Sequence, residues 1–126
     1  MPVGYCVTSL VDPEKGLIYG DHPIAELVGR SPMEVIYLLY HGKEGSQQEV
    51  QSFQKELDKR GGCSVETLEA IYQLPRKGHA MDMLAAALLI LGMCEGKGDY
   101  REDCLDAIAK MPQLVAAVIN HHAGWG

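Results

Sequence analysis

The segment that most constrains this chain is an apolar run near its middle, AMDMLAAALLIL at residues 80–91. Asp82 is the only polar residue in the run. A helix at the surface of a small protein normally keeps one face polar toward water. The run is also shorter than the roughly 20 residues that a membrane-spanning helix needs. We therefore expect a buried helix that ends at Gly92 and has almost no face suited to water.

A second segment, SPMEVIYLLYHG at residues 31–42, has the same character and clearer boundaries. Ser31 and Glu34 fit a Ser-x-x-Glu capping box, and Pro32 stands at the first helical position. Gly42 is placed to end the helix. The residues between these signals are almost all apolar, which predicts a second helix buried on most sides.

The rest of the chain predicts a hairpin and more ordinary helices. VTSL and GLIY flank the turn sequence VDPEKG, which favours a β-hairpin within residues 1–20. Ser46 and Glu49 repeat the capping box before a stripe of Val50, Phe53 and Leu57. One further helix is expected after Pro23. Another is expected after Ser64, and its apolar side consists of Val65, Leu68, Ile71 and Tyr72. A last helix is expected after a third capping box, formed by Asp99 and Glu102. Pro112 should kink or restart the last one. The fold class is mainly α, with about seven helices.

Composition narrows the classes of function. A chain of 126 residues with 47% hydrophobic and 22% charged residues is globular, and it amounts to one domain or a piece of one. The net charge of −6 argues against binding nucleic acid. The four cysteines form no metal-binding or disulfide pattern, so we expect reduced, mostly packing thiols in a cytoplasmic protein with no membrane segment.

Neither the histidines nor any known catalytic motif indicates a reaction. His22 is expected near an exposed turn, His41 at a helix C-terminus, and His79 at the start of the apolar helix. His121 and His122 are neighbours and would point in different directions on a helix, so they make a poor metal pair. No nucleophile motif or phosphate-binding loop is present. The residues alone therefore predict a helical domain without catalytic, cofactor-binding or metal-binding residues.

Four segments in order nevertheless resemble the citrate synthase family. They are TSLVDPEKGLIY followed by PIAEL, SPMEVIYLLYHGK, LPRKGHAMDMLAAALLILG, and CLDAIAKMPQLVAAVINHHAG. The resemblance implies that residues 1–126 are the N-terminal portion of a citrate-synthase-like large domain, with the hairpin at 1–20 and helices at 21–126. Three positions depart from the family pattern: Gly20 and His121 stand where the family has arginine, and Ala80 where it has proline.

The resemblance also implies a reaction that this chain cannot perform alone. In the family, acetyl-CoA and oxaloacetate condense at a site of two histidines and an aspartate, in a later part of the chain than this sequence covers. No catalytic residue is therefore expected here, and acetyl-CoA would be a substrate of the complete enzyme only. The choice between citrate and 2-methylcitrate stays open, because the acyl pocket also lies outside the sequence.

The resemblance gives the apolar helix a role in assembly. In the family this helix packs against the same helix of a second subunit, as apolar obligate interfaces do. The expected interface residues lie along residues 79–91: His79, Met81, Met83, Leu84, Ala86, Ala87, Leu88, Ile90 and Leu91.

Three readings of the chain follow. It is the scaffold part of a split enzyme, as a homodimer or with a complementing chain, or a non-catalytic module for dimerisation or regulation, or a fragment with no separate role. The lost arginines favour the second reading, and the end of the sequence at Gly126 favours the first.

Overall fold

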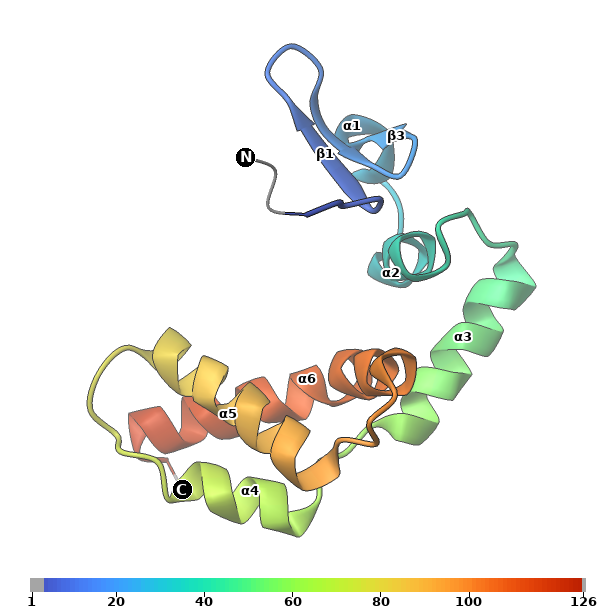
Figure 1. Ribbon diagram of the computed structural model, residues 1–126. Coiled ribbons are helices and arrows are strands. Elements are labelled where there is room, and N and C mark those ends of the chain that lie inside the picture. The colour runs from blue at the N-terminus through green and yellow to red at the C-terminus, as the bar shows by residue number, and fades with distance from the viewer. Residues whose placement is uncertain (1–3, 126) are drawn as a thin grey trace. The chain divides into compact units, whose positions relative to one another are not determined.

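The computed structural model describes residues 4–125 and shows six helices and three short strands among them (Figure 1). The chain divides into two compact units, Met1–Lys55 and Glu56–Gly126. The prediction of a mainly α fold with a short N-terminal hairpin is confirmed. Among the residues that the structure describes, no helix is both long enough and apolar enough to cross a lipid bilayer.

Unit 1 begins with a small antiparallel sheet of order β1-β2-β3. Strands β1 (Ser9–Asp12) and β2 (Gly16–Tyr19) form the expected hairpin, with Leu10 opposite Ile18. The Asp12 carboxylate shapes the turn because its Oδ1 accepts the backbone N–H groups of Glu14 and Lys15, both at 2.9 Å. A third strand, β3 (His22–Pro23), pairs with β2 and was not predicted.

Three helices follow in sequence, and the second and third of them start with a capping box. α1 (Ile24–Leu27) is a single turn. α2 (Pro32–His41) has the complete capping box of Ser31 and Glu34, and it ends at Gly42, whose φ of 71° is the left-handed conformation that glycine adopts without strain. α3 (Gln47–Arg60) starts with the second box, in which Ser46 and Glu49 exchange hydrogen bonds.

The core of unit 1 is small and partly aromatic. Its buried side chains are Leu27, Tyr37, Leu38 and Phe53. The rings of Tyr37 and Phe53 meet edge to face, with centroids 5.5 Å apart. Only Tyr37 and Leu38 of α2 are buried, and the other apolar residues from Met33 to Tyr40 are half-buried, so the helix is covered less completely than the sequence predicted.

Unit 2 contains the end of α3, from Glu56 to Arg60, and three further helices that pack on one another (Figure 1). They are α4 (Val65–Tyr72), α5 (Ala80–Glu95) and α6 (Tyr100–Ala123). α5 ends at Glu95, one turn beyond the predicted stop at Gly92. Glycine lowers helix propensity but does not by itself end a helix, and the contacts of Glu95 with Thr67 and Lys110 hold the last turn in place.

Pro112 does not divide the last helix, which corrects the expected count of about seven helices to six within residues 4–125. Proline costs α6 one backbone hydrogen bond. Leu105 before it and Leu114 and Val118 after it are all buried, so packing holds both halves in one helix.

The prediction of which residues form the buried side of α4 was also wrong in part. Val65 is 71% exposed and Tyr72 is 40% exposed, whereas Ile71 and the polar Thr67 are completely buried. The buried side of α4 therefore follows Thr67 and Ile71, which are one helical turn apart.

Candidate functional site

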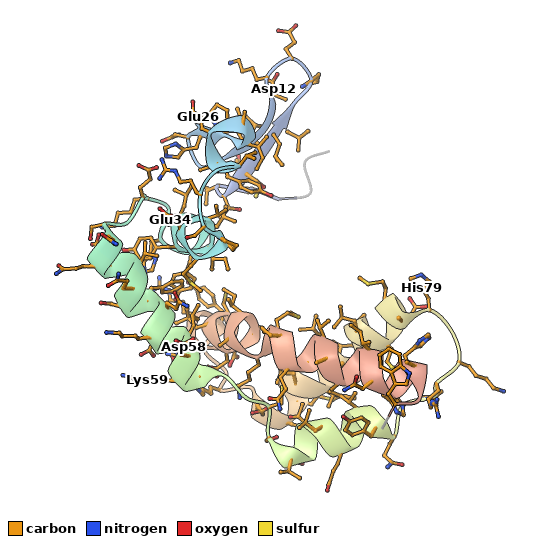
Figure 2. All side chains as sticks on the ribbon, turned by 180° about the vertical axis from the view of Figure 1, so that it is seen from behind. Asp12, Glu26, Glu34, Asp58, Lys59 and His79 are labelled. Atoms are coloured by element: carbon orange, nitrogen blue, oxygen red, sulfur yellow. The ribbon has the colours of Figure 1, made fainter. Side chains whose placement is uncertain are left out.

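His79 is the N-cap residue of the apolar helix α5, at the helix start where the sequence placed it. The Nδ1 atom of His79 accepts the backbone N–H of Met81 at 3.1 Å, so the imidazole caps the helix. Figure 2 shows His79 at the start of α5, where the side chain is exposed. Its capping role occupies one ring nitrogen and makes the other the N–H donor.

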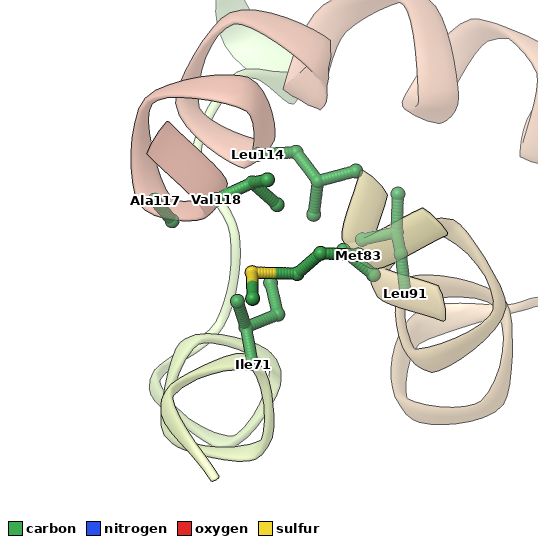
Figure 3. Packing of buried hydrophobic residues seen from close by; sticks show 7 residues of the cluster. Ile71, Met83, Leu91, Leu114, Ala117 and Val118 are labelled. Carbon is green, nitrogen blue, oxygen red and sulfur yellow. The ribbon is translucent and has the colours of Figure 1, made fainter. Parts of the chain in front are cut away.

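One face of α5 belongs to the core of unit 2 (Figure 3). Met83, Ala87 and Leu91 recur every four residues and are at most 6% exposed. They pack with Ile71 of α4 and with Leu114, Ala117 and Val118 of α6. We call Met83, Ala87 and Leu91 the inner face of α5.

The opposite face of α5 is apolar apart from the exposed Asp82 in the first turn, and nothing in the described residues covers it. Met81 is 60% exposed, Leu89 is 69% exposed and Met93 is 77% exposed. Leu88, Ala85 and Gly92 are exposed between them. We call this set the outer face of α5: Met81, Ala85, Leu88, Leu89, Gly92 and Met93.

The structure divides the predicted interface residues between these faces. His79, Met81 and Leu88 are exposed, and Leu84, Ala86 and Ile90 are half-buried. Met83, Ala87 and Leu91 have little surface left for a partner, because the core of their own unit covers them. Leu89 and Met93, the most exposed apolar residues of the helix, were not predicted. Contact with a partner stays a prediction for the whole set.

The end of α5 is held by a polar cluster that the sequence did not reveal. Glu95 Oε2 accepts hydrogen bonds from the Thr67 hydroxyl at 2.8 Å and from the Ser64 N–H at 3.2 Å, and Oε1 pairs with Lys110 of α6. Burial by itself would raise the pKa of Glu95, but the hydrogen bonds from Lys110, Thr67 and Ser64 outweigh it and hold that pKa below its ordinary value. Glu95 thereby joins α4, α5 and α6 and satisfies the buried hydroxyl of Thr67.

A second cluster anchors α6 to the C-terminal end of α3. Arg60 Nη1 lies 2.7 Å from Glu102 Oε2 and 2.9 Å from Asp106 Oδ1, and Lys97 Nζ lies 2.8 Å from Asp106 Oδ2. The pairing of Glu102 with Arg60 corrects the predicted third capping box. Asp99 Oδ1 accepts the N–H of Arg101 at 2.9 Å, but the Glu102 carboxylate points to Arg60 instead of the helix start.

The remaining histidines have structural partners. His41 Nδ1 donates to the Tyr37 carbonyl at 3.2 Å, which confirms its place at the end of α2. His121 and His122 donate from Nε2 to the carbonyls of Leu74 and Gly78, at 2.8 and 3.1 Å. They tie the α4–α5 loop to the end of α6.

His22 is half-buried between Glu26 and Glu44, not exposed as predicted. Among residues 4–125, no three histidine, cysteine or acidic side chains are arranged to hold a metal ion.

The cysteines are four free thiols, of which only two pack. Cys63 and Cys94 are half-buried, and burial raises the pKa of Cys63. Cys6 and Cys104 are exposed, so the packing prediction was wrong for these two. Hydrogen bonds from Thr8 and Ser9 lower the pKa of Cys6 to about 6.

The described geometry is therefore a helical unit with two long packed helices, α5 and α6, of which α5 carries exposed apolar side chains as well as buried ones. The family model described as citrate synthase, C-terminal domain, matches residues 1–125. The chain belongs to the citrate synthase family, as its sequence segments indicated.

Relatives of known identity agree with this assignment. A citrate synthase of Saccharolobus solfataricus is 31% identical, over 94% of this chain and 33% of its own length. The 2-methylcitrate synthase 2 of Corynebacterium glutamicum is 29% identical, over 95% of this chain and 33% of its own length. The chain thus spans about one third of the relatives it matches.

A solved structure matches the fold. The citrate synthase of Thermoplasma acidophilum, in a ternary complex with carboxymethyl coenzyme A and oxaloacetate, superposes with a TM-score of 0.85. The match covers 98% of this chain and 34% of that one at 22% identity.

Proposed function

We propose that this chain supplies scaffold and interface helices to an enzyme of citrate synthase type. That enzyme condenses acetyl-CoA, or a related acyl-CoA, with oxaloacetate. A citrate synthase and a 2-methylcitrate synthase match the chain over almost the same fraction of it, so the proposal covers both acyl donors. From the cysteine pattern we propose the cytoplasm as its compartment.

The outer face of α5 is the observation that carries the proposal. Methionine and leucine side chains that are more than half exposed stand together on one helix face. Contiguous apolar surface of this kind marks interaction sites in folded proteins. Ala85 and Gly92, at the middle of the same face, leave room for the backbone of another helix to approach. The occupant that we propose is either a second copy of the chain or the rest of the enzyme.

The polar residues support a scaffold role and not a catalytic one. His41, His79, His121 and His122 are hydrogen-bonded to backbone atoms of their own chain. The half-buried or buried carboxylates of Glu95 and Asp106 are neutralised by Lys110, Arg60 and Lys97. A general base needs a free side chain within reach of a substrate proton. We therefore propose that the chain alone does not catalyse the condensation.

Complementation tests this proposal. The chain is co-expressed with the segment of the Saccharolobus solfataricus citrate synthase that it does not match, and thiol release from acetyl-CoA is measured with oxaloacetate. We expect no turnover from either polypeptide alone, turnover from the mixture, and a raised melting temperature for the mixture, because partners that bind only the folded state stabilise it.

Two variants and one control measurement distinguish a scaffold of the enzyme from a regulatory module. The Leu89→Glu variant should fail to complement, whereas Gln51→Glu, which adds the same charge at an exposed position of α3, should complement normally. Activity of the second segment alone, unchanged by the chain, would contradict the scaffold proposal and favour a non-catalytic module.

A further inference from the structure

We draw no further inference here: the strongest candidate, the exposed apolar outer face of α5 around Leu88, Leu89 and Met93, belongs to the interface already proposed, and nothing in the described residues shows what else covers it.

Discussion

The two faces of α5 have nearly the same composition and opposite surroundings. The inner face is methionine, alanine and leucine packed against α4 and α6. The outer face is methionine, alanine, leucine and glycine exposed to solvent, with Asp82 at its N-terminal end. The inner face stabilises the unit, since burying a leucine or methionine side chain contributes about 1.5–3 kcal/mol. The outer face contributes nothing comparable until another surface covers it. The difference teaches that folding of the unit accounts for the apolar residues of the inner face only, and assembly is the purpose that we propose for the outer face.

The sharpest test of this comparison places the same charge on both faces. Ala87→Glu buries a carboxylate at a position with 0% exposure, which should cost on the order of several kcal/mol and unfold unit 2. Ala85→Glu, two residues earlier and exposed, should leave the folding of the unit unchanged. Helicity and urea denaturation by circular dichroism measure both. Equal loss of helicity in the two variants would mean that the faces are not distinct.

A cavity on the inner side should have the next largest effect. Leu114 is completely buried against the inner face of α5, so Leu114→Ala should lower the free energy of unfolding by about 2–5 kcal/mol. Ile119→Ala, on the same helix but half exposed, is the control and should cost much less. Similar urea midpoints for the two variants would contradict the assignment of the core to this side of α6.

Breaking one hydrogen bond of the Glu95 cluster should have a smaller effect. Thr67→Val keeps the shape of the side chain but removes the hydroxyl that donates to Glu95, which leaves a buried acceptor with one partner fewer. The expected loss is about 1–3 kcal/mol in the free energy of unfolding. The variant Thr67→Ser retains the donor and should lose less. A stability unchanged by Thr67→Val would show that the Glu95 cluster does not hold the three helices together.

The same cluster predicts how stability depends on pH. The pKa of Glu95 is lower in the folded chain than in the unfolded chain. Its contribution is therefore fully present above the ordinary glutamate value of about 4.3, and it is lost as the pH falls through the folded pKa. Urea midpoints between neutral and acidic pH should fall less steeply for Glu95→Gln than for the unaltered chain. Parallel pH profiles would contradict the lowered pKa.

Local features of this fold were predictable from the sequence, and contacts between distant residues were not. The boxes at Ser31 and Ser46 were predicted because both partners lie within one turn. The box at Asp99 failed because Arg60, far earlier in the chain, captures the Glu102 carboxylate. The inner and outer faces of α5 were not told apart, since Asp82 is the only polar residue between Ala80 and Leu91 and a single polar residue is a weak mark of the surface side. Thr67 was overlooked because its partner Glu95 lies in another helix.

Sedimentation of the unaltered chain and of Leu89→Glu tests the central claim most directly. Leu89 is 69% exposed, so the substitution should leave helicity and the urea midpoint nearly unchanged. If the outer face of α5 is an interface, the unaltered chain should associate with itself or with the complementing segment in a concentration-dependent manner. The variant should remain a monomer under the same conditions, and Gln51→Glu should behave as the unaltered chain does. Identical sedimentation of the Leu89→Glu variant and the unaltered chain, alone and with the complementing segment, would contradict the assignment of the outer face to assembly.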